Sequence, residues 1–365
     1  LAKLRANGTT IWQQTYSQRT NEPSHVTLTS DGGFLITANT YSTNDGHFLP
    51  SLIRTDGNGV SLWEAMIPTD NSEYIHCSAE TADGGFFSVG TILLRTDSSG
   101  NKLWQTPFEP RALCILRLDN SFVVVRESLD GQSIELHTFD LLGMALAQHT
   151  LISPNGFRDW IQVAAATLKQ DQTILLAGLS NTATRSRQGY LLCTTASGEI
   201  LWAKMYYPIY NVNEELNLRP YSVIETVDSG YLLVGKIEGF SLEGAPSAIA
   251  IHMDSRGVPS YDLALSLRGF DEGHLSLIQT SDKGYLITGE FWCFEQTRPP
   301  KNLLKFPSDE EALPISTPSD LTATFRPPNS IELLWKDNSF NETKVLIERK
   351  PSLSTQWLQI ATLPA

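Results

Sequence analysis

The sequence predicts an all-β fold built from repeated antiparallel hairpins, and three observations support this. An apolar strand, a short Asp/Asn/Gly turn and a strand with Trp four residues after the turn glycine recur as LAKLRANGTTIW, LIRTDGNGVSLW, LLRTDSSGNKLW and LLCTTASGEILW. A second hairpin alternates with this one along the chain. Helical periodicity is almost absent, and the WIQVAAATL segment aligns with the other first strands, so we expect a strand there.

The second hairpin joins an apolar strand to an aromatic or branched strand through a tight turn that is usually Asp/Gly. Its copies include VTLTSDGGFLITA, AETADGGFFSVG, VIETVDSGYLLVG and LIQTSDKGYLITG. Turns such as Asp31-Gly32-Gly33 supply the positive φ that tight hairpins need. Runs of Val, Ile, Thr, Phe and Tyr flank them, as is typical of half-buried strands.

Two hairpins make a unit of four strands, which can bury its apolar faces only by stacking on its copies. Six copies of each hairpin occur over residues 1–306, and the array opens with the Trp hairpin and ends with the Asp/Gly one. This count predicts a six-bladed β-propeller whose first and last hairpins share a blade. Seven blades is the alternative, because the NLLKF segment reads as one more third strand and residues before Leu1 could supply a missing hairpin. The chain begins inside a repeat, and we expect a longer precursor.

The repeated tryptophans occupy a fixed place after the turn glycine, so we expect them to pack between neighbouring blades rather than to bind ligand. They are Trp12, Trp63, Trp104 and Trp202. Aromatic residues outside these positions are the better binding candidates. They are Tyr206, Tyr207 and Tyr210 in the MYYPIYN segment, together with Trp160 and Trp292.

The phrases DGGFLITA and LIRTDGNGVSLW resemble the repeats of secreted bacterial β-propeller proteins and, more distantly, those of quinoprotein propellers. The resemblance covers about residues 1–306 and implies the fold. Quinoproteins carry an adjacent-cysteine disulfide and an acidic calcium site. This sequence has neither a Cys-Cys pair nor such a cluster, so no cofactor is carried over.

Residues 307–318, PSDEEALPISTP, read as a linker, and residues 319–365 resemble the first half of a fibronectin type III domain. The expected strands there are Leu321–Phe325, Ser330–Lys336, Lys344–Lys350 and Trp357–Leu363, with Trp335 at the position of that family's buried tryptophan. Such sandwiches take about 100 residues, so this segment resembles only part of one. It would be completed by further chain or by a strand from a neighbouring molecule.

Composition narrows the function. The formal net charge is −13 and no basic run occurs, which argues against nucleic acid and anionic lipid as partners. No stretch nears the roughly 18 apolar residues of a membrane span. Metal-binding histidine or cysteine motifs, a nucleophile elbow, a P-loop and a dinucleotide fingerprint are missing, so no catalytic or metal-ligating residue is assigned. One Asp per turn is too few for calcium, and turn formation is the better account.

These observations favour a non-enzymatic protein, extracellular or on the cell surface, in which the propeller is a rigid assembly or display module. Its partners would be other copies of itself or other surface proteins. The alternative is a carbohydrate-binding or carbohydrate-cleaving propeller, with glycans as ligands at the central mouth or on the MYYPIYN segment. A quinone-dependent oxidoreductase is a third hypothesis. Two glycosylation sequons occur, at Asn7 and Asn341, for which chance is the simpler explanation.

Overall fold

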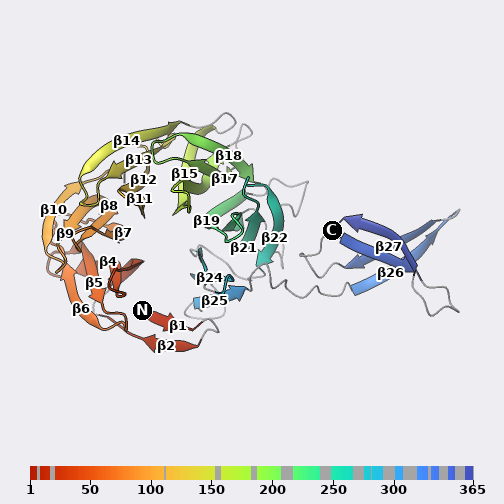
Figure 1. Ribbon diagram of the computed structural model, residues 1–365, viewed down its shortest axis with the longest axis horizontal. Helices are drawn as coiled ribbons and strands as arrows, with labels where there is room; N and C mark the ends of the chain where they lie inside the picture. The colour runs from red at the N-terminus through yellow and green to blue at the C-terminus, as the bar shows by residue number, and fades with distance from the viewer. Residues whose placement is uncertain are drawn as a thin grey trace.

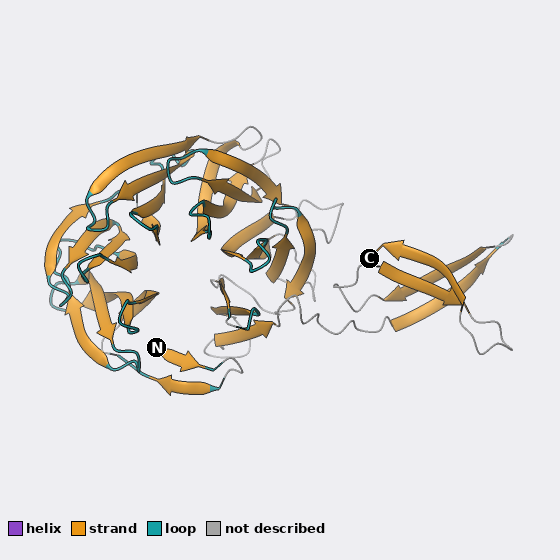
Figure 2. Ribbon diagram, in the orientation of Figure 1, coloured by secondary structure: helices purple, strands orange, loops and turns teal. Residues whose placement is uncertain are grey.

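The computed structural model describes residues 1–5, 9–16, 21–110, 112–152, 158–181, 187–206, 217–238, 248–265, 275–280, 282–290, 301–306, 319–327, 330–336, 344–349 and 358–364. The expected all-β class is confirmed, because every regular element in these ranges is a strand (Figure 2). The described residues accordingly contain no helix long and apolar enough to span a membrane.

The body of the molecule is a series of antiparallel sheets in which each strand pairs with the next along the chain. A two-stranded sheet comes first, formed by β1 (Ala2–Leu4) and β2 (Thr10–Gln13). Five four-stranded sheets follow: β3 (Asn21–Leu28), β4 (Phe34–Ser42), β5 (His47–Thr55) and β6 (Ser61–Met66); β7 (Ile75–Glu80), β8 (Phe86–Gly90), β9 (Ile92–Thr96) and β10 (Lys102–Pro107); β11 (Ala112–Arg117), β12 (Phe122–Glu127), β13 (Ser133–Phe139) and β14 (Ala145–Ile152); β15 (Arg158–Leu168), β16 (Ile174–Asn181), β17 (Arg187–Thr194) and β18 (Ile200–Tyr206); β19 (Asn217–Glu225), β20 (Tyr231–Glu238), β21 (Ala248–Met253) and β22 (Pro259–Leu265). A three-stranded sheet of β23 (Leu275–Gln279), β24 (Tyr285–Glu290) and β25 (Lys301–Phe306) ends the series.

These sheets are arranged in a ring with the first strands near the centre and the fourth strands outside (Figure 1). The first strands contact one another in the order β3, β7, β11, β15, β19 and β23. The WIQVAAATL segment lies in β15, as expected for a strand. The predicted two-hairpin repeat is therefore the unit of the ring.

The hydrophobic core is divided among the interfaces between sheets. Five buried clusters fill the five interfaces between consecutive sheets from β3–β6 to β23–β25. In the first of them, Leu35 and Leu52 pack against Ile75, Phe86 and Leu94. Because a sheet between two neighbours buries both of its faces, its strands show less alternation of apolar and polar residues than the strands of a sheet with one face in solvent.

The sequence predicted that the first and last hairpins of the array share one blade, but in the structure they lie in separate sheets. Among the described strands, β1 pairs only with β2, and β24 pairs with β23 and β25. β25 holds the third-strand position that the first hairpin would need in a shared blade. The NLLKF segment is indeed a strand, and its backbone pairing with β24 is what keeps the two end hairpins in separate sheets.

The C-terminal residues form two separate hairpins outside the ring (Figure 1). β26 (Ser319–Arg326) pairs with β27 (Ser330–Lys336), and β28 (Lys344–Arg349) pairs with β29 (Leu358–Pro364). These strands match the four expected ones to within two residues at each end. The expected linker, residues 307–318, lies outside the described residues.

Candidate functional site

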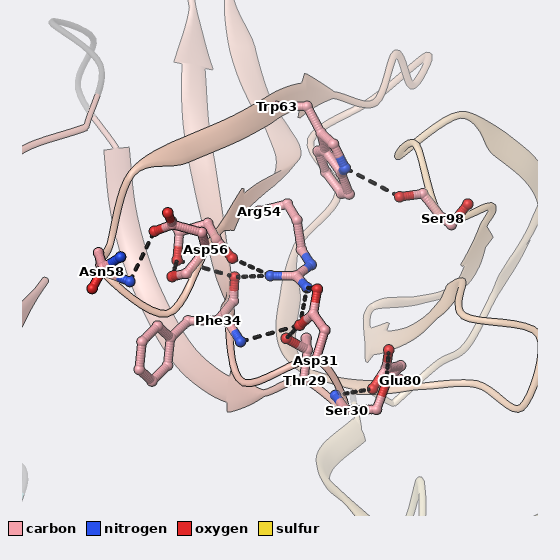
Figure 3. Close-up of polar contacts among 12 residues, drawn as sticks. Thr29, Ser30, Asp31, Phe34, Arg54, Asp56, Asn58, Trp63, Glu80 and Ser98 are labelled. Atoms are coloured by element: carbon pink, nitrogen blue, oxygen red, sulfur yellow. Dashed lines mark hydrogen bonds and ion pairs between the residues drawn. The ribbon is translucent and has the colours of Figure 1, made fainter.

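The Asp turn of the first hairpin carries a network of polar contacts in several units, and Figure 3 shows it in the β3–β6 sheet. Asp31 accepts hydrogen bonds from the Thr29 hydroxyl (2.8 Å) and from the Gly33 backbone N–H (3.1 Å). Arg54 on the third strand reaches back and donates to both carboxylate oxygens of Asp31, at 2.5 and 2.6 Å. The turn is thereby tied to the middle of its own sheet.

The two partners of this ion pair differ in exposure. The Arg54 side chain is 7% exposed and that of Asp31 is 61% exposed. The hydrogen bonds from Thr29 and Gly33, together with the guanidinium, hold the pKa of Asp31 down at about 2. Gly33 is required for the approach, because a Cβ there would overlap the Thr55 carbonyl oxygen and the Arg54 guanidinium. The second glycine of the DGG turn is thus explained by the arginine that passes it.

The same register position carries a basic side chain in most of the described sheets, and this side chain contacts the turn aspartate. Arg95 lies opposite Trp104 as Arg54 lies opposite Trp63, and it pairs with Asp83 at 2.5 Å. Elsewhere the pairs are Lys305 with Asp282 (2.6 Å) and His252 with Asp228 (3.6 Å), while Lys169 next to the turn pairs with Asp171 (3.0 Å).

These contacts give the turn aspartates a structural role. The pKa of Asp282 is also held at about 2, chiefly by hydrogen bonds from Lys305 and Thr280, so the carboxylate is ionised. No group of three or more His, Cys, Asp or Glu side chains among the described residues could hold a metal ion. The geometry therefore agrees with turn formation as the account of the Asp/Gly motifs.

Each repeated tryptophan packs on the turn of the following sheet. Trp63 lies against Phe86 with ring centroids 5.8 Å apart, and its indole N–H donates to the Ser98 carbonyl oxygen at 3.1 Å (Figure 3). A Cβ on Gly100, whose φ is +82°, would come within 2.7 Å of the Trp63 ring. The other three tryptophans are placed alike. Trp12 lies beside Gly59 and Phe34, Trp104 beside Gly143 and Phe87, and Trp202 beside Gly257 and Tyr231.

The predicted binding aromatics do not form a site in the described residues. Tyr206 was expected on an exposed connection, but it ends β18 with 5% exposure and packs in the core with Tyr231 and Met253. Its hydroxyl donates to the Gly257 carbonyl oxygen at 2.6 Å, and burial raises its pKa, so it is not available for stacking on a sugar. The prediction for Tyr206 is therefore wrong, because strand β18 extends through it.

Trp160 lies in β15, and its side chain is not among those described. Five further predicted residues fall outside the described ranges. They are Tyr207, Tyr210 and Trp292 of the binding set, with both sequon residues, Asn7 and Asn341, also outside. The sequence prediction for these positions stays a prediction.

An aromatic cluster that the sequence reasoning missed lies at the ring face opposite the Asp turns. Tyr41 at the end of β4 contacts Phe48 of β5 with ring centroids 5.4 Å apart. Phe48 in turn contacts Tyr74, just before β7, at 5.6 Å. Tyr41 is 42% exposed. The signal was weak, since single aromatics at strand ends are common, and only the fold brings these three together.

A half-buried charge cluster lies between the second and third four-stranded sheets. Glu135 accepts hydrogen bonds from Arg126 (2.7 Å) and pairs with His137 at 3.0 Å. The Arg126 guanidinium also covers the Phe108 ring, 4.5 Å from its centroid. Burial lowers the pKa of His137 and keeps the imidazole neutral near pH 7. The carboxylate is shared with Arg126, so the cluster joins two sheets rather than presenting a free base.

The described cysteines Cys77, Cys114 and Cys193 are free thiols. Burial raises the pKa of Cys114 to about 12, so this thiol is protonated and unreactive. Cys293 lies outside the described residues.

Among the described strands, the first sheet, β1–β2, has two strands where the five sheets after it have four. Val26 and Leu28 of β3 are 44% and 68% exposed, although they lie on a first strand near the ring centre. Ile278 of β23, on the other side of the β1–β2 sheet, is 53% exposed. No buried apolar cluster of the described residues lies between β1–β2 and either neighbouring sheet.

Four-stranded antiparallel sheets arranged around a central axis, each packed face to face on the next, define the β-propeller class. The ring in Figure 1 has this arrangement, and the chain is a β-propeller protein with additional C-terminal hairpins.

Comparison with known proteins gives structural likeness only. No protein-family model matches the chain, and no curated protein matches it. Similar solved structures include BamB from Moraxella catarrhalis, with 12% identity, a TM-score of 0.43 and coverage of 78% of this chain and 86% of that one. The β-propeller domain of the Trilobed protease from Pyrococcus furiosus has 11% identity, a TM-score of 0.46 and coverage of 89% and 96%. The Pan2 WD40 domain from Neurospora crassa has 10% identity, a TM-score of 0.42 and coverage of 73% and 86%.

Proposed function

We propose that this chain is a non-enzymatic structural or adhesion protein of the cell exterior, in which a seven-position propeller is a rigid module for assembly. The internal ion pairs and the tryptophan contacts support rigidity. The ion pairs join the turns at Asp31 and Asp83 to their own sheets, and the Trp63 contact joins its sheet to the next. A body locked in this way is suited to holding other surfaces at fixed positions.

The observation that carries the proposal is the apolar face of the β26–β27 hairpin. Strand alternation places Leu321, Ala323 and Phe325 of β26 on the same face as Ile331, Leu333 and Trp335 of β27, since Ala323 lies opposite Leu333 and Phe325 opposite Ile331. Leu321, Phe325 and Ile331 are 67%, 62% and 63% exposed. Contiguous exposed apolar surface of this kind marks sites of protein association.

The extracellular setting and the fibronectin-like identity of β26–β29 belong to the same proposal. The bounds of the four strands agree to within two residues with those expected from the fibronectin type III resemblance, which supports this part of the proposal. A second molecule of the same chain that covers this face would link copies in a series.

Light scattering after size-exclusion chromatography, with electron microscopy of the same fractions, tests the proposal. We expect oligomers or fibres that grow with concentration, and we expect Phe325→Ser to abolish them. Leu129→Ser is the matched control, because Leu129 is 83% exposed at an isolated turn of the ring. A protein that stays monomeric up to about 100 µM, where typical weak self-association is already visible, would contradict the proposal.

Glycan binding is the second candidate, and the Tyr41, Phe48 and Tyr74 cluster favours it, because exposed aromatic rings stack on sugars. A glycan array compares the wild type with Tyr41→Ala and Tyr74→Ala. Binding that both substitutions abolish supports this function, and no binding across a broad panel eliminates it.

A further inference from the structure

The outer strand β14 carries an alanine at the register position where other fourth strands carry the repeated tryptophan. Trp104 lies opposite Arg95 of its third strand, and Ala147 lies opposite Thr138 in the same way, each just after the bulge of its strand. The buried clusters at three other interfaces each include a repeated tryptophan. Among the described residues, the cluster between β11–β14 and β15–β18 includes none.

The missing ring changes the cover of the turn glycine in the following sheet. The four turn glycines that lie under a tryptophan are buried, and they are Gly59, Gly100, Gly143 and Gly257. Gly198, the turn glycine that follows Ala147, is only half-buried, and Ala147 itself is exposed. A Cβ on Gly198 would meet His149 and Leu151 of β14, at 3.0 and 3.5 Å. These two side chains contact the turn from one side, and no tryptophan of the described residues covers it.

The four occupied positions show which chemical group fits this one. Gly198 has a φ of +83° and no side chain, so a flat ring can approach its backbone closely. The indole N–H of Trp63 donates to the carbonyl oxygen of Ser98, two residues before the turn glycine Gly100. The equivalent carbonyl here belongs to Ala196, which is half-buried. The position therefore suits a planar aromatic ring with one N–H donor, which is the chemistry of an indole.

The edge of β14 is also the best suited of the fourth strands to pair with an added strand. Among the described strands β14 pairs with β13 alone, and it lies on the outer side of the ring (Figure 1). Met144 and Leu146 beside it are 59% and 60% exposed. Charged side chains on an edge strand oppose pairing with another chain, and β14 has no Asp, Glu, Lys or Arg. The fourth strands of the other four-stranded sheets each have one, at Glu64, Lys102, Lys204 and Asp262.

We propose that β14 and the turn at Gly198 form a docking site for an extended segment of a partner polypeptide that carries a tryptophan. The segment pairs with β14 as a fifth strand, and its tryptophan lies opposite Ala147 on the same face of the sheet. Side chains placed in this way are about 5 Å apart, so the indole reaches over the small Ala147 to Gly198. Its N–H donates to the carbonyl oxygen of Ala196. The inference depends on the ring alone and not on β26–β27, so it and the proposed function can fail separately.

The direct probe is a fluorescein-labelled peptide of alternating threonine and valine with one central tryptophan. Fluorescence anisotropy with the full chain should show saturable binding at one site. The same peptide with alanine in place of tryptophan should bind at least about tenfold more weakly, because it lacks the ring that covers the turn. N-acetyl-tryptophanamide supplies the indole without a strand and should bind more weakly than the tryptophan peptide. Hydrogen exchange should show new protection of β14 with the peptide only.

Substitutions at Ala147 test the position from within the chain. Ala147→Trp should abolish peptide binding and raise the melting temperature, because it reproduces the packing of Trp104 on Gly143. Ala147→Leu is a smaller filling substitution and should weaken binding. Gln148→Trp is the matched control, since it adds the same side chain at an exposed position on the opposite face of β14 and should leave binding unchanged.

Thermal unfolding checks that each variant is folded. Absence of peptide binding, equal binding of the tryptophan and alanine peptides, or binding that survives both Ala147 substitutions would overturn the proposal. Tighter binding of N-acetyl-tryptophanamide than of the peptide would also overturn it, because the ligand would then be a free indole instead of a polypeptide strand.

Discussion

Removing the carboxylate of Asp83 should reduce stability more than removing the whole ion pair. The Arg95 side chain is 3% exposed, and its guanidinium donates to Asp83 at 2.5 and 2.7 Å. Asp83→Asn leaves this buried charge without its counter-ion, which typically lowers the free energy of unfolding by about 3–5 kcal/mol. Because Asp83 is 51% exposed, water reaches that side, and we expect the lower end, about 3 kcal/mol.

The double variant Asp83→Asn with Arg95→Met should be less destabilised than Asp83→Asn alone, by about 1 kcal/mol, since no unpaired charge then remains buried. Urea unfolding followed by tryptophan fluorescence measures all three proteins. Asp130→Asn is the matched control. Asp130 accepts from a neighbouring hydroxyl (2.5 Å) and a backbone N–H (3.0 Å) as Asp83 does, but no cation pairs with it in the described structure. A double variant as unstable as Asp83→Asn, or a control that loses as much, would refute this reasoning.

Three further predictions concern the packing, the pH response and the turn. Trp63→Ala should lower the free energy of unfolding by about 3 kcal/mol, because it removes the ring, and Trp63→Phe by about 1 kcal/mol, because it mainly removes the indole hydrogen bond. Urea unfolding measures both variants, and equal losses of stability would contradict the packing role. The pKa of Asp31 falls from 3.8 to about 2 on folding, so the stability it contributes is present above pH 3.8 and is lost as the pH falls toward 2. Asp31→Asn should flatten the decline of the melting temperature over that range, and an unchanged acid profile would be inconsistent with this pKa. Gly33→Ala should lower the free energy of unfolding by at least about 2 kcal/mol more than Gly46→Ala does, because Gly46 has a positive φ but open space around it. Similar melting temperatures for the two variants would show that the close approach of Arg54 to Gly33 does not matter for stability.

Local patterns in the sequence were sufficient to predict the strands and turns. The Asp-Gly-Gly signal at Asp31 predicted a hairpin because the backbone conformation of such turns is set by a few adjacent residues. The same holds for the Ser330–Lys336 strand, whose bounds agree with the structure. Periodic apolar residues and turn residues act over a short range, and a single sequence is enough to interpret them.

The strand pairing at the ends of the array and the contacts of Tyr206 could not be predicted from local sequence patterns. By sequence, either β1 or β25 could pair with β24, because both have the pattern of a third strand. Only the three-dimensional structure shows that β25 is the strand that pairs with it. Tyr206 lies at the boundary between a strand and a polar connection, where strand ends are hardest to predict.

The apolar core of the described structure is divided among five interfaces between neighbouring sheets. Contacts in such an array are made between nearest neighbours, so each sheet depends mainly on the sheets beside it. Amide exchange should therefore differ from sheet to sheet instead of reporting a single global opening.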